Sequence, residues 1–111
     1  MTPIRLTQAT ALVLRAMTAG HRYGFEIMEA SGLPSGTVYP VLRRLEEWGH
    51  VTSHWEEEAE ARTQGRPRRR LYALTRAGMA LAGTARERLA EARRLLAEDP
   101  GMDEVRGAGE A

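Results

Sequence analysis

The chain contains no cysteine and no lysine among its 111 residues. Without cysteine it can form no disulfide bond, no thiolate nucleophile and no cysteine-based zinc site, which fits a reducing compartment such as the cytoplasm. Without lysine it lacks the amine needed for a Schiff base or for a phosphate-binding loop of the Walker type. All sixteen cationic side chains are therefore arginine, a bias that we attribute first to codon usage in a GC-rich genome.

Long hydrophobic runs are absent from the sequence as well. Arg5, Gln8 and Arg15 interrupt the apolar residues near the N-terminus, so we expect no secretory signal, and no later segment approaches the length of a membrane span. A chain of this length fits one domain with a modest core, and an exposed apolar helix face would need a partner to cover it. We expect a single-domain cytoplasmic protein without membrane association.

The side chains of common active sites and metal sites are scarce. The three serines include none in a nucleophile elbow, and no histidine stands beside paired acids. His50 and His54 are four residues apart, but they fall across a predicted helix end and strand, where that spacing does not bring two rings onto one ion. The acidic run that begins at Glu56 lacks the alternating ligands of a calcium loop and reads as a solvated charge run. We expect no enzyme, no metal and no cofactor.

The net charge is only +1, but the charges are unevenly distributed. Seven arginines and no acid lie between Arg62 and Arg86, whereas the acidic run precedes this stretch and most of the remaining acids follow it. A local excess of arginine creates a positive field even when the whole chain is nearly neutral. The distribution indicates a polyanionic partner for this segment.

Apolar spacing predicts three short helices in the first half of the chain. They are expected at residues 7–19, 24–31 and 35–48. Thr7 and Ser35 are the predicted N-caps of the first and third helices. Gly32 and Gly49 follow the second and third helices, where a left-handed conformation ends a helix. The second and third helices, joined by a tight turn, predict a helix-turn-helix.

The third predicted helix has two different faces. The apolar face consists of Val38, Val41, Leu42 and Leu45. The opposite face and its edges carry Gly36, Thr37, Tyr39, Pro40, Arg43, Arg44, Glu46 and Glu47. Pro40 lacks an N–H group, so we expect the first turn to be bent or loosely wound. Threonine, tyrosine and arginine on the outward face suit a DNA duplex, because phosphates favour arginine and base edges favour short polar groups.

Two segments, 51–57 and 69–74, alternate as strands do and predict an antiparallel hairpin. The connection between them is long and polar and includes Gly65, Arg66 and Pro67, which resist regular strand pairing. We expect this loop to project into solvent. Trp48 and Trp55 are expected to be packing residues at the helix end and in the hairpin.

A final helix is predicted at residues 75–97, with Thr75 as its cap and the Asp99-Pro100-Gly101 segment as its end. It is too long for this small domain to cover. Small and apolar residues repeat along it at alternating spacings of three and four, which is typical of the seam between two packed helices. These predicted dimer-interface residues are Ala82, Ala85, Leu89, Ala92 and Leu96.

Together these elements predict a mainly α fold with a small β-hairpin, that is, a winged helix-turn-helix followed by a dimerisation helix. The predicted organisation is a DNA-binding domain at residues 4–74, a dimerisation helix at 75–98 and a flexible tail at 99–111. At this point the sequence resembles the PadR-type transcriptional regulators. The matching segments are residues 23–27, 33–46, 65–72 and 74–78, in the family's order.

The resemblance implies a homodimer that binds double-stranded DNA at an operator and usually represses transcription. The third helix would lie in the major groove, and the hairpin, called the wing, near the minor groove or the backbone. The residues implied to face DNA are Tyr23, Ser35, Thr37, Tyr39, Arg43, Arg66, Arg68, Arg69 and Arg70. The short C-terminal part resembles the compact subgroup of the family.

Two questions stay open at this stage. Some members of the family bind planar compounds between the subunits through an aromatic residue on the last helix. The last helix here has none, which argues against an effector pocket of that kind, and a small-molecule effector stays unidentified. The same fold also allows a winged-helix module that binds a protein partner instead of DNA. Without the resemblance, Tyr39 could equally pack its ring against the wing.

Overall fold

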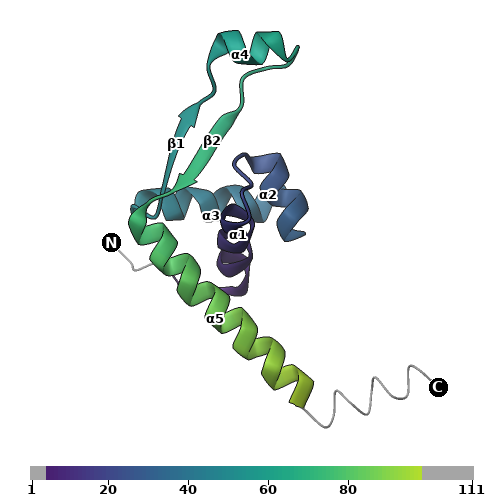
Figure 1. The fold of residues 1–111 in the computed structure, drawn as a ribbon, viewed down its shortest axis with the longest axis vertical. Helices are drawn as coiled ribbons and strands as arrows, with labels where there is room; N and C mark the ends of the chain where they lie inside the picture. Colours follow the sequence, from purple (N-terminus) through teal and green to yellow (C-terminus); the bar gives the residue numbers. More distant parts are fainter. Residues whose placement is uncertain (1–4, 99–111) are drawn as a thin grey trace, which may run out of the picture.

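A computed structural model describes residues 5–98 of the chain, and its fold confirms the prediction of a mainly helical winged helix (Figure 1). The elements in chain order are α1 (Gln8–Thr18), α2 (Gly24–Ser31), α3 (Ser35–Glu47), β1 (Val51–Trp55), α4 (Glu58–Thr63), β2 (Arg70–Leu74) and α5 (Arg76–Glu98). The predicted tail at residues 99–111 lies outside the described residues. No helix within residues 5–98 combines the length and the apolar character needed to cross a membrane.

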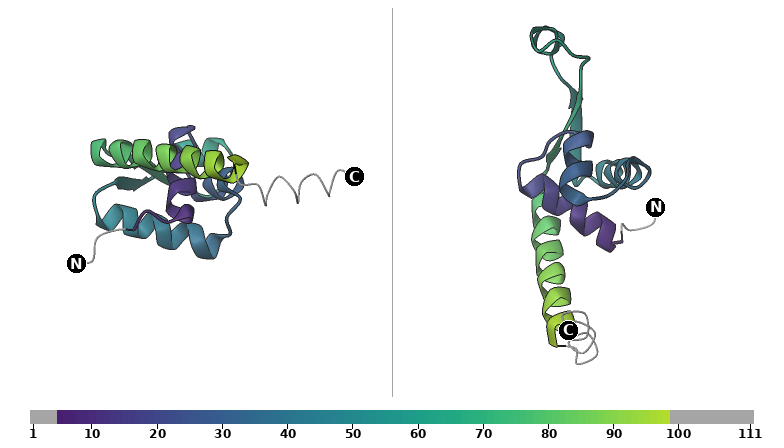
Figure 2. Two further views of the ribbon diagram at one scale, coloured as in Figure 1. Left: turned by 90° about the horizontal axis from the view of Figure 1, so that it is seen from below. Right: turned by 90° about the vertical axis from the view of Figure 1, so that its right-hand side faces the viewer.

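The core lies where α1 packs against α2, α3 and the first half of α5 (Figure 2). We call these four parts the body. Val13 and Leu14 of α1 and Ile27 of α2 are fully buried in it. The predicted apolar face of α3, consisting of Val38, Val41, Leu42 and Leu45, is buried there too and is thereby confirmed. Each such side chain contributes about 1.5–3 kcal/mol by leaving water.

The cap of α1 and the glycines that follow α2 and α3 agree with the sequence prediction. Thr7 caps α1, since its Oγ1 accepts a hydrogen bond from the backbone N of Thr10 at 3.1 Å. Gly32 ends α2 with φ +74°, and Gly49 follows α3 with φ +77°. These glycines adopt the left-handed conformation that other residues rarely tolerate.

The start of α3 differs from the prediction. Ser35 is the first helical residue and not the cap, because the carbonyl of Pro34 accepts the first bonds, from the backbone N atoms of Thr37 and Val38, both at 3.0 Å. The helix continues through Pro40 as one element. Proline at that position leaves the carbonyl of Gly36 without its usual helical donor, and Gly36 is exposed, so water can supply the missing bond.

The predicted hairpin is confirmed, with slightly shorter strands. β1 and β2 pair antiparallel, in a register that runs from Val51 opposite Leu74 to Trp55 opposite Arg70. Their connection is not only a loop, because it contains the short helix α4, which the sequence prediction missed. Glutamates in its first turn suit the positive end of a helix. Residues 51–74 form the wing, whose tip projects away from the body (Figure 1).

The start of α5 fits closely onto the turn between α3 and β1. Thr75 caps the helix as predicted, since its Oγ1 accepts from the backbone N of Gly78 at 3.1 Å and donates to the carbonyl of Gly49 at 2.6 Å. The backbone N of Thr75 also donates to the carbonyl of His50 at 3.0 Å. A Cβ atom at position 78 would lie 1.9 Å from that carbonyl oxygen, so this approach requires glycine.

The two halves of α5 have different surroundings. Ala82 and Ala85 are buried in the core of the same chain, and Leu89 packs against that core. The second half of α5 extends past the body (Figure 2), and Leu95 and Leu96 in this half are 56% and 55% exposed. The five residues predicted as one dimer seam are therefore divided, because α1 of the same chain covers the first part of the stripe.

Candidate nucleic-acid interface

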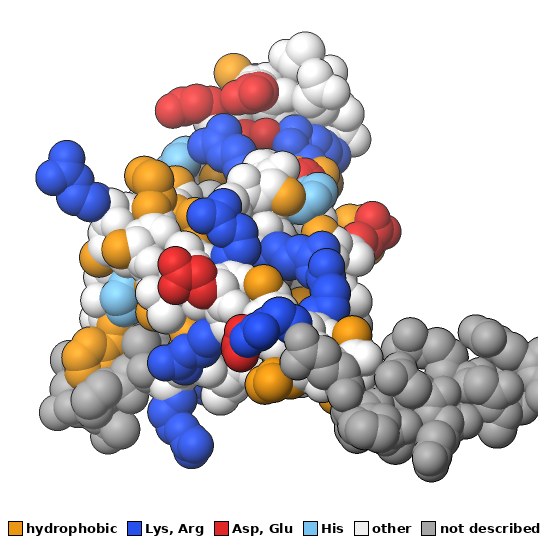
Figure 3. Space-filling model, turned by 60° about the horizontal axis from the view of Figure 1, so that its bottom comes forward, with side chains coloured by type: hydrophobic (Ala, Val, Ile, Leu, Met, Phe, Trp, Pro, Cys, Tyr) orange, Lys and Arg blue, Asp and Glu red, His pale blue; other side chains and the backbone are white. Residues whose placement is uncertain are grey.

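A cleft of about 690 Å³ lies between the end of α1, β2 and α5. Its lining includes the apolar side chains of Met17, Met79 and Ala82 and the guanidinium-bearing Arg15 and Arg86. Seen from below, the surface of the molecule carries arginine side chains with apolar ones between them (Figure 3). Within residues 5–98 there is no cluster of histidine and acidic side chains that could hold a metal ion.

The polar surface of α3 carries four of the residues predicted to face DNA. Ser35 and Arg43 are exposed, Thr37 is partly buried, and Tyr39 is exposed although it is aromatic. They lie on a helix whose opposite face is anchored in the core, so the body fixes how this surface is presented. One face of α3 is thus buried and the other presents polar and arginine side chains to solvent.

The ring of Tyr39 packs against the start of α2. A Cβ atom at position 24 would lie 2.2 Å from the Tyr39 hydroxyl, so the missing side chain of Gly24 makes room for the tyrosine ring. This contact packs the first half of α3 against the start of α2. It also holds the hydroxyl of Tyr39 beside Gly24, the residue that follows Tyr23.

A chain of hydrogen bonds ties the wing to the second half of α3. The hydroxyl of Ser53 in β1 donates to the carboxylate of Glu46, and the Nε of Arg70 donates to the Ser53 hydroxyl at 3.0 Å. A guanidinium nitrogen of Arg70 also lies 3.8 Å from Glu46. Glu46 and Ser53 were not predicted as site residues, and their role is to orient the wing relative to α3.

Trp55 differs from the prediction that it packs inside the hairpin, because it is 52% exposed. The guanidinium groups of Arg68 and Arg70 lie 5.9 and 5.5 Å from the centre of its ring. Such cation–π contacts orient arginine side chains without neutralising them. The result is an exposed patch on the wing with one aromatic ring and two cations.

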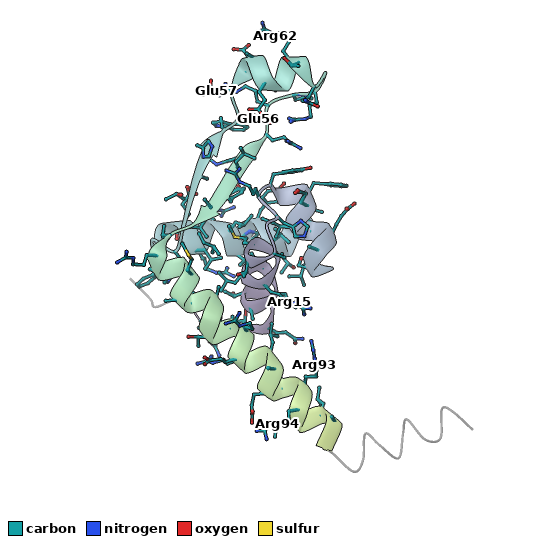
Figure 4. All side chains as sticks on the ribbon, viewed as in Figure 1. Arg15, Glu56, Glu57, Arg62, Arg93 and Arg94 are labelled. Carbon is teal, nitrogen blue, oxygen red and sulfur yellow. The ribbon has the colours of Figure 1, made fainter. Side chains whose placement is uncertain are left out.

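The next residue, Glu56, corrects the prediction of a solvated acidic run. Its side chain is only 3% exposed and accepts hydrogen bonds from both terminal nitrogens of Arg66, of which Nη2 lies at 2.7 Å, and from Arg69 at 3.3 Å. Its backbone carbonyl accepts from the Nε of Arg68 at 2.8 Å. Figure 4 labels Glu56 where β1 leads into α4, whereas the labelled side chains of Glu57 and Arg62 lie nearer the tip.

The hydrogen bonds from Arg66 are the main reason that the pKa of Glu56 falls from 4.5 to about 2. Desolvation acts in the opposite direction, and the positive charges of Arg66 and Arg69 add to the lowering. The carboxylate in turn raises the pKa of Arg66. This group of charges is therefore ionised at neutral pH.

Tyr23 joins the same cluster from the body. The guanidinium of Arg69 lies 3.9 Å from the centre of the Tyr23 ring, and Tyr23 forms an isolated β-bridge with Leu71 of the wing. The structure thus brings Tyr23, Arg66 and Arg69 together around Glu56, a residue that the sequence prediction had not assigned to the site. The available signal was its place directly opposite Arg69, inside the predicted strand segments 51–57 and 69–74 and one step beyond the strand pairing that the structure shows.

Comparisons with known proteins identify the family and the fold. The sequence matches the model of the transcriptional regulator PadR-like family over residues 13–83. A comparison with curated protein sequences finds no match. Several solved structures share the fold. One is a PadR family transcription regulator from Clostridium difficile R20291, with a TM-score of 0.67 and 21% identity over 83% of this chain and 97% of that chain.

Two further structures extend the likeness. A transcriptional regulator from Clostridium thermocellum has a TM-score of 0.64 and 21% identity over 83% of this chain and 89% of that chain. The PcaV transcriptional regulator from Streptomyces coelicolor, solved with its natural ligand, has a TM-score of 0.67 and 23% identity over 95% of this chain and 75% of that chain. At these identities the likeness is one of fold.

Proposed function

Because the chain belongs to the PadR-like family of transcriptional regulators, we propose that it is a homodimeric repressor that binds an inverted-repeat operator in the cytoplasm. The family is one of regulators and not of enzymes. The observation that carries the proposal is the polar face of α3 beside an arginine-bearing wing, with Glu46, Ser53 and Arg70 holding the two in a fixed relation.

In this proposal α3 enters the major groove. Ser35 and Thr37 lie at the start of the helix, where base edges or nearby phosphates are within reach of a short hydroxyl side chain. Arg43 is exposed further along and would contact a guanine or a phosphate. The hydroxyls of Tyr39 and Tyr23 would reach the backbone, and so would arginines of the wing.

The second half of α5 would form the dimer. Since Ala82 and Ala85 are used within one chain, the seam would consist of Leu89, Ala92 and Leu96, with Leu95 beside them. Two exposed leucines on a helix that leaves the body are costly to solvate, and a second copy would cover them. The dimer would place two copies of α3 in successive major grooves, about 34 Å apart.

Selection of bound fragments from random DNA tests the function directly. A two-fold symmetric consensus sequence is the expected result, whereas recovery of no enriched sequence would contradict an operator-binding role.

Arg43→Ala should relax the preference at one position in each half-site and cost about 1–3 kcal/mol of binding free energy on the selected site. Arg44→Ala is the matched control, because it removes the same charge from the neighbouring exposed position.

The oligomeric state needs a separate measurement. Leu95→Glu combined with Leu96→Glu should convert the dimer into a monomer in sedimentation and weaken operator binding, because one half-site is then bound alone. If the native chain sediments as a monomer at high micromolar concentration, the dimer proposal is wrong.

One observation favours a second candidate, a module that binds a protein partner. Phe25 on α2 is an aromatic side chain that is 60% exposed, and exposed aromatics often anchor protein interfaces. In that case Phe25→Ala would abolish partner binding, and the native chain would show no salt-dependent binding of DNA. Titration of mixed-sequence DNA at two salt concentrations separates the two functions.

A further inference from the structure

The arginines of the wing fall into two groups with different partners. Arg70 pairs with Trp55 across the hairpin, and the adjacent pair consists of Arg69 and Glu56. Glu56 and Arg69 follow directly beyond the strand ends, where the backbone N of Glu56 still donates to the carbonyl of Arg69 at 2.8 Å. Because successive residues of a strand point to opposite faces, continued alternation puts these two pairs on opposite faces of the wing. Arg68 joins Trp55 and Arg70, whereas Arg66 joins Glu56 and Arg69.

The guanidinium groups of Arg66 and Arg69 are already occupied. Arg66 makes a two-nitrogen contact with the Glu56 carboxylate, the geometry in which arginine also binds a phosphate. Arg69 lies between that carboxylate and the Tyr23 ring, and its Nε is buried. A phosphate could recruit either arginine only by withdrawing it from a carboxylate that is 3% exposed, and an unpaired buried charge is strongly unfavourable.

Arg68 and Arg70 are in a different position. Both are exposed, and each uses its Nε for a hydrogen bond within the wing, to the carbonyl of Glu56 and to the hydroxyl of Ser53 respectively. These bonds and the Trp55 ring orient the two side chains. Arg70 also has a terminal nitrogen 3.8 Å from Glu46, but the two side chains of that pair are 41% and 37% exposed, so a phosphate can compete for this arginine at little cost, unlike for those held by the buried Glu56.

We propose that Glu56 is a positioning residue for DNA binding, which holds Arg66 and Arg69 as the frame of the wing and leaves phosphate contact by the wing to Arg68 and Arg70. This inference rests on the proposed function, and it divides the wing arginines into those that shape the wing and those that meet the duplex.

The salt dependence of DNA binding distinguishes the two groups. Each phosphate contact contributes about 0.9 to the slope of log affinity against log salt concentration. Arg68→Ala or Arg70→Ala should therefore lower the slope by about 1 per protomer. Arg66→Ala or Arg69→Ala should weaken binding through a disordered wing and leave the slope unchanged.

A double variant removes the charge of Arg66 while keeping the structure of the wing. Glu56→Gln with Arg66→Gln turns the carboxylate and its two-nitrogen partner into two amides that can still form a hydrogen bond, while Arg69 keeps its contact with the Tyr23 ring and an amide oxygen as acceptor. We expect the slope of log affinity against log salt concentration to equal that of the native protein. The affinity for DNA should lie within about threefold of the native value, a difference smaller than 1 kcal/mol. A reduced slope would identify Arg66 as a phosphate contact.

A matched pair of single variants tests the role of Glu56 by whether the affinity for DNA rises or falls. Glu56→Gln and Glu57→Gln make the same change of charge at neighbouring positions, one buried and one exposed. Simple electrostatics predicts tighter DNA binding for both, because each removes a negative charge. We expect Glu57→Gln to bind as tightly as the native protein or slightly more tightly, and Glu56→Gln to bind about tenfold more weakly.

A spectroscopic measurement adds a reading that is independent of affinity. In ¹⁵N spectra of the arginine side chains, the Nε–H signals of Arg68 and Arg70 should shift when DNA is added, and those of Arg66 and Arg69 should stay in place. Tighter binding by Glu56→Gln, or equal loss of slope at all four arginines, would overturn the inference while the proposed function stands. If the native protein ignores DNA even at low salt, both fail.

Discussion

The body and the wing of this protein are held together by different forces. In the body, fully buried aliphatic side chains from α1, α2 and α3 meet in one core. In the wing, Val51 and Tyr72 join this core at the base of the hairpin, and further out a buried carboxylate with its arginines supplies the order. Apolar burial is insensitive to pH and salt, whereas ion pairs are not. The comparison teaches that the wing can be loosened selectively while the body stays folded.

The largest effect is expected from truncation in the body. Leu14→Ala removes a fully buried side chain from α1 at the centre of the core and should destabilise the protein by about 2–5 kcal/mol. Thermal or chemical unfolding measures this loss. Met79→Ala, at an exposed apolar position on α5, is the control and should have little effect on the monomer. Equal losses at the two positions would mean that the core is misassigned.

Gly78→Ala tests the junction where the wing returns to the body. The added Cβ would lie 1.9 Å from the carbonyl oxygen of His50, so α5 must shift away from the turn. Overpacking of this kind costs about 1–3 kcal/mol. Gly83→Ala is the control, because a Cβ there meets nothing within 4 Å and alanine favours a helix. A native melting temperature for Gly78→Ala would contradict the close approach.

Acid should loosen the wing through Glu56. Its folded-state pKa of about 2 lies below the ordinary value of 4.5, so its ion pairs contribute stability that is complete above the ordinary value and is lost as the pH falls towards 2. The difference in melting temperature between the native protein and Glu56→Gln should therefore narrow across this interval. With Glu57→Gln we expect no such narrowing, and a constant difference for Glu56→Gln would argue against the lowered pKa.

The smallest effect is expected at the tip of the wing. Arg62 and Glu58 form an exposed pair one helical turn apart, with nitrogen and oxygen 3.3 Å apart. Exposed pairs of this kind contribute about 0.3–0.5 kcal/mol and are screened by salt. Arg62→Ala should leave the melting temperature almost unchanged. A large loss of stability would show that α4 supports the wing far more than its exposure suggests.

Local patterns were sufficient to predict the body. The apolar spacing of α3, the Thr7 and Thr75 caps and the glycines that end α2 and α3 depend on residues close together in sequence, and the structure confirms them. The hairpin was predictable for the same reason, since alternation is also a local signal.

Contacts between distant residues explain what the sequence prediction missed. Glu56 is buried because Arg66 and Arg69 come back to it across the wing, and the stripe on α5 is divided because α1 covers Ala82 and Ala85. Spacing along one helix cannot tell whether a neighbouring helix of the same chain or a second copy covers its apolar stripe. The roles of the predicted DNA-facing residues stay predictions until binding is measured.

The tight fit of Gly78 against the carbonyl of His50, together with the bond from Thr75 to the carbonyl of Gly49, makes the start of α5 and the end of α3 a single joint. A tilt of α5 would therefore move α3 with it as one rigid unit. In a dimer of this chain, the angle at which the two α5 helices cross would set the distance between the two copies of α3.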